Sequence, residues 1–199
     1  MLPSRSTSAR PRRLDAAFGR DTRGSVAIEF AIVGLACAWL IVEAFQAGLY
    51  VYTFAAVNDA TSRAVRKVMT GTVSQQGLTA TQFRTEILCP LLPAGMTCAS
   101  VVTNIQSVSE DLRPNGFYKF VNTAGTAVIT PAMDNTLTTF CSGGSGTVIY
   151  AQVFYAMPVF SPAWRAVGTV SFNGAPAHLV SSAAVFKNEP FPSSTATGC

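Results

Sequence analysis

The sequence predicts an α+β protein in which one long N-terminal helix crosses a membrane and continues into a small head with a short second helix and an antiparallel sheet. Three observations predict this class. An apolar segment near the N-terminus runs into an amphipathic one with no proline between them. Further along, apolar residues change from helical spacing to the alternation typical of strands. The 199 residues, 49% apolar and 12% charged, leave room for one domain and an anchor.

Positive charge is concentrated at the N-terminus. Residues 1–24 hold six arginines and two aspartates, a net charge of +4, whereas residues 25–199 hold eight basic and eight acidic side chains. Because the remainder has no net charge, we expect no basic face that would bind nucleic acid. Arginines beside a hydrophobic segment mark the cytoplasmic side of a membrane span. We therefore expect residues 1–24 to be a cytoplasmic leader.

The apolar segment that follows the leader carries no charge from Phe30 to Val42. A spanning helix needs roughly 20 residues, and Phe30–Leu49 supplies them if Glu43 is tolerated. We place the span at about residues 28–52, with the C-terminal head across the membrane. A cleaved secretory signal is a weaker interpretation, because cutting at Ala36-Cys37-Ala38 would leave bare hydrophobic residues at the new N-terminus.

The helix is predicted to continue past the membrane as far as Thr70. Apolar residues recur there at helical spacing, while polar and charged residues fall on the other side. Arg66 and Lys67 complement the negative helix end, and Gly71 suits the position after it. We therefore assign residues 25–71 to one helix, roughly 70 Å long at 1.5 Å per residue. Its apolar stripe is predicted to contain Phe54, Val57, Ala60 or Thr61, Ala64 and Val68.

Residues 72–199 are expected to form an extracytoplasmic α+β head. Thr79-Ala-Thr-Gln82 is a capping box and predicts a second helix, which Pro90 and Pro93 end. After it, β-branched and aromatic residues alternate in a way that favours antiparallel strands. The predicted strands are residues 100–108, 147–157 and 178–187.

Two parts of the head carry weaker patterns. Residues 109–146 are polar and contain glycines, with one weak strand at about 127–129. In residues 160–172, Pro162 followed by Ala-Trp-Arg-Ala-Val indicates one helical turn.

The five cysteines agree with an oxidising location for the head. Cys37 lies in the apolar run and is expected to be unpaired. The other four allow three connectivities. Among these we expect Cys89–Cys98, which would close a short loop, and Cys141–Cys199, which would tie the C-terminal residue to the mid-domain loop. A metal site is the alternative, but this spacing and a single distant histidine match no zinc pattern.

Catalytic motifs are absent from the sequence. His178, the single histidine, starts a predicted strand and is expected at the surface. Gly143-Gly-Ser-Gly146 is followed by threonine, where a nucleophile elbow would need glycine. The acidic pair Glu110-Asp111 is expected to be solvated. With no metalloprotease, phosphate-loop or dinucleotide motif, we predict a protein that is not an enzyme and needs no cofactor.

The start of the helix resembles a known processing signal. Arg23-Gly24-Ser25-Val-Ala-Ile-Glu29-Phe30 ahead of a membrane helix is similar to the class III signal of type IV prepilins. Further along, Cys89 and Cys98 flank Pro-Leu-Leu-Pro before a valine-rich strand, and the last strand ends in Phe186-Lys-Asn-Glu-Pro-Phe191. Together these features resemble the TadE-like family, the minor pilins or pseudopilins of the tight-adherence (Flp) type IVb pilus system.

The resemblance implies a function in pilus assembly. Prepilin peptidase would cut after Gly24 on the cytoplasmic side and leave the helix in place, with Ser25 at the new N-terminus. In the family's assembly models the glutamate at the position of Glu29 pairs with that amine on a neighbour. Glu29, Phe30 and Glu43 are therefore expected at assembly contacts. The implied partners are the major Flp pilin, a sister pseudopilin and the inner-membrane assembly platform.

Glu29 and Glu43 are carboxylates in an otherwise apolar part of the helix. A carboxylate in lipid costs about 2.5 kcal/mol or more, which either a paired amine or access to the headgroups would relieve. For Glu43 the two interpretations are contact with a partner helix and a position near the outer interface beside Gln46. The expected location is the bacterial inner membrane, single-pass, with a periplasmic head. The alternative function is an uncleaved, membrane-anchored binding domain outside any pilus.

Overall fold

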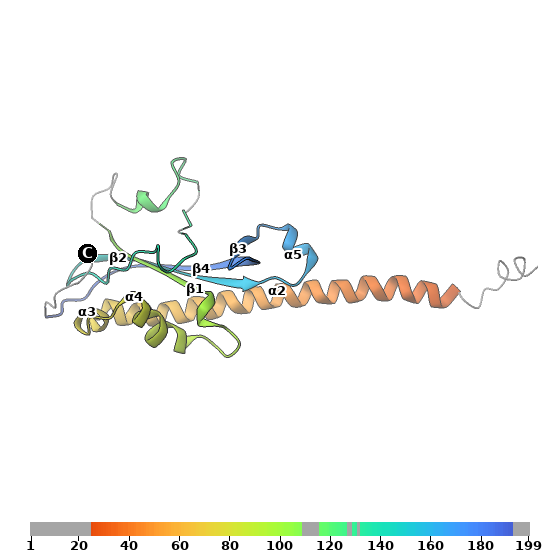
Figure 1. Cartoon of the computed structure of the whole chain (residues 1–199), viewed down its shortest axis with the longest axis horizontal. Helices are drawn as coiled ribbons and strands as arrows, with labels where there is room; N and C mark the ends of the chain where they lie inside the picture. The colour runs from red at the N-terminus through yellow and green to blue at the C-terminus, as the bar shows by residue number, and fades with distance from the viewer. Residues whose placement is uncertain (1–24, 109–115, 127–128, 131, 193–199) are drawn as a thin grey trace, which may run out of the picture. The chain divides into compact units, whose positions relative to one another are not determined.

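The computed structural model describes residues 25–108, 116–126, 129–130 and 132–192 of the chain (Figure 1). Contacts divide the chain into two units, Met1–Val42 and Glu43–Cys199. The described elements confirm the predicted α+β class. Besides two 3-10 turns around the first disulfide, they are α2 (Ser25–Met69), α3 (Thr72–Gln75), α4 (Ala80–Gln82), a π-helix (Phe83–Leu88), β1 (Val101–Val108), a 3-10 turn (Phe117–Phe120), β2 (Val148–Pro158), α5 (Pro162–Ala166), β3 (Val170–Phe172) and β4 (Ala175–Lys187).

The sheet has four strands in the order β1-β2-β4-β3, and every neighbouring pair is antiparallel. β2 lies in the centre and pairs along its whole length with β4, from Val148 opposite Lys187 to Pro158 opposite Ala177. Its side chains from Ile149 to Met157 are all buried, as expected for a strand covered on both faces. The three predicted strands are thus present within a few residues of their predicted bounds.

The sequence prediction missed strand β3. β3 and β4 form a hairpin whose two turn residues are Asn173, with φ 50°, and Gly174, with φ 78°. An Asn-Gly pair with both φ values positive is the preferred two-residue hairpin turn. The Asn-Gly dipeptide is therefore the local signal for this hairpin, although the strand before it has only three residues. The predicted helical turn after Pro162 is present as α5.

The second half of α2 covers one face of the sheet. Its buried residues share a core with Ile105, Val153 and Val180 of the three long strands. Phe54, predicted in the stripe, is 49% exposed instead, because the face that meets the sheet passes through Thr53. The buried positions recur every three or four residues, as helix geometry requires: Gln46, Thr53, Val57, Ala60, Thr61, Ala64, Val65 and Val68.

The opposite face of the sheet carries buried amides beside a second, smaller apolar cluster of Val108, Phe120 and Tyr150. Asn104 Nδ2 donates to Gln152 Oε1 over 3.0 Å, and Gln152 Nε2 donates to the Tyr150 hydroxyl over 2.9 Å. The Phe120 ring covers Tyr150, with the ring centroids 4.2 Å apart. Burial raises the pKa of the Tyr150 hydroxyl, and the hydrogen bond from Gln152 partly offsets this. Phe120, from the chain after β1, thus helps to cover the sheet face opposite α2.

The outer edge of β1 is covered by residues between β1 and β2. Ile105 pairs in parallel with Phe140, through Ile105 N–H to Thr139 O at 2.9 Å and Cys141 N–H to Ile105 O at 2.8 Å. The Asn135 side chain donates to Val101 O over 2.8 Å. A covered edge cannot pair with a foreign strand. The weak strand predicted at 127–129 lies partly outside the described residues.

The chain after β4 fastens the sheet to the C-terminal end of α2. Asn188 is buried, and its amide donates to Ser142 O at 2.9 Å and to Gly144 O at 3.0 Å. The next N–H, of Glu189, donates to Met69 O over 2.9 Å. The Asn-Glu-Pro-Phe segment thus closes the fold by joining β4 to both the helix end and the loop before β2.

Gly71 lies under the last aromatic residue of this segment. It has φ 79°, and a Cβ placed on it would come within 2.4 Å of the Phe191 ring. The position therefore excludes a side chain for two reasons, the left-handed backbone and the ring above it. Gly77 shares only the first reason, because it has φ 61° but no atom within 4 Å of such a Cβ.

We predict that Gly71→Ala destabilises the head more than Gly77→Ala does. The backbone term costs about 1–2 kcal/mol in each variant, and displacing the Phe191 ring adds about 1–3 kcal/mol in Gly71→Ala alone. Chemical unfolding of the full-length protein in detergent measures both values. In a Phe191→Ala background the two glycine variants should cost the same. Equal costs in the wild-type background would contradict the ring contact.

Candidate functional site

The first half of α2 exposes its apolar side chains on every side. Phe30 is 77% exposed, Leu35 76% and Trp39 52%. Every described side chain from Val26 to Val42 is exposed, apart from the half-buried Gly34 position. A monomeric soluble protein rarely leaves such a large contiguous apolar surface open to water. By length and composition α2 is able to cross a membrane, and it is the only helix of the described residues that is.

The predicted processing and assembly residues lie at the start of this helix. Ser25 is its first residue, whereas Gly24 lies outside the described residues. Glu29 and Phe30 are both exposed in the first turns, among apolar neighbours. Ser25 and Glu29 are four positions apart, so they lie on the same face of the helix. The carboxyl group and the residue that cleavage would leave at the N-terminus are thus one helical turn apart.

Glu43 contacts the head of its own chain. Its Oε2 accepts a hydrogen bond from the Ser161 hydroxyl. One turn along α2, Gln46 is completely buried, and its Oε1 accepts from the Phe160 N–H over 3.3 Å. Ser161 Oγ also accepts from the Trp164 N–H over 3.4 Å, which caps α5. We call Glu43, Gln46, Phe160 and Ser161 the polar clasp.

Two polar atoms of the polar clasp have unsatisfied hydrogen-bonding capacity. Glu43 Oε1 and Gln46 Nε2 are buried and have no hydrogen-bond partner among the described residues. One is an acceptor and the other a donor, and they lie on adjacent turns of one helix face. Leaving such an atom without a partner costs about 1–3 kcal/mol.

Aromatic rings surround the clasp on the side of α5. The Trp164 ring lies 5.6 Å from the Tyr50 ring and 5.3 Å, edge to face, from the His178 ring. His178 Nε2 lies 2.8 Å from Trp164 O. The expectation that His178 is a surface residue is wrong. Only 8% of it is exposed, because its strand position points toward α2 and α5.

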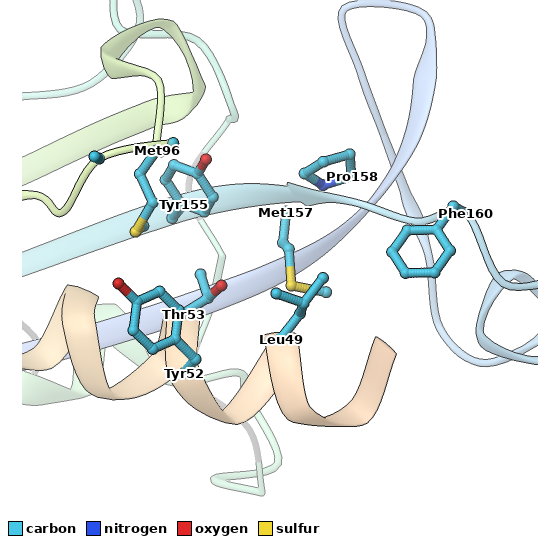
Figure 2. A pocket seen from close by; sticks show the side chains of 10 residues that line it. Leu49, Tyr52, Thr53, Met96, Tyr155, Met157, Pro158 and Phe160 are labelled. Carbon is cyan, nitrogen blue, oxygen red and sulfur yellow. The ribbon is translucent and has the colours of Figure 1, made fainter. Parts of the chain in front are cut away.

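An apolar groove lies beside the clasp, between α2 and the end of β2. It has a volume of about 220 Å³. Figure 2 shows Leu49 rising from the helix toward Met157 and Tyr52 rising toward Met96, and Phe160 also lines the groove. Met96, from the loop closed by the first disulfide, lines the same groove. With its mostly carbon lining, the groove suits an apolar occupant rather than a charged one.

The cysteines follow the predicted pattern where the structure describes them. Cys89 and Cys98 form a disulfide across the loop that supplies Met96, with their Cα atoms 5.5 Å apart. Cys141 is also disulfide-bonded. Its predicted partner, Cys199, lies outside the described residues, so that pairing stays a prediction. Cys37 is free and exposed on the apolar half of α2.

The described part of the chain offers no metal-binding arrangement. No group of three or more histidine, cysteine or acidic side chains within it is placed to hold a metal ion. Hydrogen bonds from the Thr136 N–H and hydroxyl lower the pKa of the exposed Asp134, which stabilises a turn. Gly143, of the glycine-rich segment, has φ 65° and packs against Ile149. Glu110 and Asp111 lie outside the described residues.

Comparisons of the chain with known protein families, with curated proteins and with solved structures find no match. The candidate site therefore rests on its own residues. Glu29 and Phe30 belong to the first unit and Glu43 to the second, so they are two separate sites. The sequence analysis did not assign Ser161 or Trp164. Ser161 before Pro162 was the available signal, because this pair is typical of a helix start.

We predict that Ser161→Ala weakens the head. It removes the donor to Glu43 and the cap of α5, so the free energy of unfolding should fall by about 1–3 kcal/mol. Ser181→Ala is the matched control, because Ser181 is exposed on β4, and it should change stability by less than about 0.5 kcal/mol. Thermal unfolding of the full-length protein in detergent compares the two. A Ser161→Ala protein as stable as the control would rule out an energetic role for the clasp.

Proposed function

We propose that this chain is a TadE-like minor pilin or pseudopilin of the inner membrane that takes part in assembling a tight-adherence type IV pilus. It is a single-pass protein, with its leader in the cytoplasm and its head in the periplasm. Prepilin peptidase removes the leader after Gly24. The observation that carries the proposal is the position of Glu29, five residues after Gly24, on a helix that exposes only apolar neighbours.

The exposed half of α2 supports a membrane location. Twenty residues from Val26 to Phe45 span roughly 30 Å at 1.5 Å per residue, about the thickness of the hydrocarbon core. Glu43 and Gln46, which bind to the head, are near the end of this stretch. We therefore propose that the span ends near Phe45, rather than at residue 52 as the sequence alone suggested.

The position of Glu29 favours assembly over simple anchoring. A membrane anchor needs no carboxyl group at this depth, and placing one in lipid costs about 2.5 kcal/mol or more. After cleavage, Ser25 carries a free amine at the membrane edge. Pairing of Glu29 with this amine on a neighbouring subunit would relieve the cost in the assembled state. The carboxyl group would then set the register between neighbouring helices, with Phe30 packing beside it.

The disulfide and the closing segment agree with a periplasmic head. Disulfides persist in oxidising compartments, and Cys89–Cys98 closes the loop beside β1. The Asn-Glu-Pro-Phe segment, which contributed to the family resemblance, fastens β4 to α2. This segment therefore serves the fold and leaves the helix as the part available for assembly with the major pilin, a sister pseudopilin and the assembly platform.

Processing at Gly24 provides the test of this proposal. In cells with an active prepilin peptidase, we expect Gly24→Ala to keep residues 1–24, because cleavage in this family follows a glycine. Gly34→Ala is the control, since it makes the same change where a Cβ has ordinary space, and it should be processed normally. Intact mass of the membrane-extracted protein distinguishes the two forms. Normal processing of Gly24→Ala would exclude the assigned site.

Glu29→Gln separates cleavage from assembly. We expect this variant to be cleaved normally but no longer to copurify with the major pilin. The uncharged amide cannot form an ion pair with the amine. Glu86→Gln, at an exposed position of the head, should behave as wild type. Full copurification of the Glu29→Gln protein would reject the assembly role of this residue and favour a membrane anchor.

A further inference from the structure

We propose that the head rests on the membrane through one face, which is immersed in the headgroup layer of the periplasmic leaflet. This face consists of Phe45, Phe160, Trp164, Arg165 and Val167, and we call it the proximal face. The inference rests on the proposed membrane span. It also goes beyond it, because a single-pass anchor does not require its head to touch lipid.

Four residues of the proximal face are exposed, Trp164 is half-buried, and all but Arg165 are apolar. Phe45 is 62% exposed, Phe160 47% and Val167 67%. The rings of Phe45 and Phe160 lie 6.2 Å apart, so α2 and the segment before α5 share one surface. The groove of Figure 2 continues this apolar surface from Phe160 toward Tyr52.

The polar clasp fixes the level of this face along α2. Ser161 bonds to Glu43, the Phe160 N–H bonds to Gln46, and the Trp164 ring packs on Tyr50. Residues 160–164 therefore lie beside residues 43–50 of the helix. All of these residues belong to the second unit, Glu43–Cys199, so their arrangement does not depend on how the first unit is placed.

Chain continuity then sets the depth of the face. A span from Val26 to Phe45 fills the hydrocarbon core of about 30 Å. The headgroup layer adds roughly 5–8 Å on each side of that core. The helix rises about 7.5 Å from Phe45 to Tyr50, which is the depth of this layer. Phe160 and Trp164, fastened to this part of α2, therefore lie at the level of the headgroups.

The chemistry of the face matches that layer. Tryptophan is enriched at membrane interfaces, where one part of the ring is apolar and the other wet. Arg165 is the only charged residue in residues 159–174, and its side chain is exposed. Arginine near the membrane surface is attracted to anionic lipid phosphates by about 1 kcal/mol. The segment itself contains no carboxyl group, and the carboxyl group beside it is that of Glu43, which Ser161 binds.

Tryptophan quenching in lipid nanodiscs tests this inference. Trp39 lies in the proposed span and Trp164 in the proximal face, so Trp39→Phe and Trp164→Phe each leave one reporter in the full-length protein. The nanodiscs contain phosphatidylcholine and phosphatidylglycerol brominated either near the headgroup end or near the tail end of the acyl chains. We expect shallow bromines to lower Trp164 emission about twofold and deep bromines to lower it less. Trp39 should respond most to deep bromines.

The two reporters separate this inference from the proposed function. If bromines at either depth quench Trp39 but leave Trp164 unchanged, the span stands and the proximal face does not touch lipid. If Trp39 also fails to respond, the span itself is wrong and the inference fails with it. Cross-linking of Val167 to a second copy, without quenching of Trp164, would assign the face to another subunit and overturn the proposal.

A charged substitution provides a matched control. Val167→Asp places a carboxyl group on the exposed proximal face and should reduce the quenching of Trp164 by shallow bromines. Val185→Asp makes the same change at a position that is 51% exposed on β4, near the C-terminal end of α2, and should leave quenching unchanged. Equal quenching of Trp164 in both variants would contradict the assignment of the face to lipid.

Discussion

The structure depends on a single helix that faces two different environments. Up to Val42 its side chains are exposed all round and, Glu29 apart, mostly apolar, whereas from Gln46 to Val68 a buried stripe forms part of the head core. Without that stripe, one face of the sheet would lose its cover, and without lipid or partner helices the first half would stay open to water. The polar clasp marks the change from one environment to the other, and its hydrogen bonds tie the head to the helix there.

The polar residues of the apolar part of α2 are explained by what lies beside each of them. Glu43 and Gln46 interrupt an apolar sequence, yet both bind the segment that leads into α5. Glu29 lies one helical turn from the residue that cleavage would make the N-terminus. The contact with the head explains Glu43, whereas for Glu29 the proposed explanation is an assembly contact. The closing segment of the sheet explains why Gly71 and Phe191 occur together.

Much of the fold was predictable because its signals are local. The long helix and the three long strands follow from periodicity, and the capping box follows from the Thr79 hydroxyl accepting from the Gln82 N–H three residues on. What the sequence analysis missed depends on contacts between distant residues. Phe54 was assigned to the buried face because its spacing fits, but only the sheet decides which side of the helix is covered. His178 was expected at the surface because nothing near it in the sequence indicates Trp164 and Tyr50.

The native thiol of Cys37 gives the most direct test of the account, because it is free and exposed on the apolar half of α2. In intact membranes a charged, membrane-impermeant maleimide should not label Cys37, since lipid or partner helices surround it. After denaturation in detergent, without reductant, the same thiol should react fully. No labelling before denaturation and one label per chain afterwards is the result that the account predicts. Rapid labelling of Cys37 in intact membranes would contradict it.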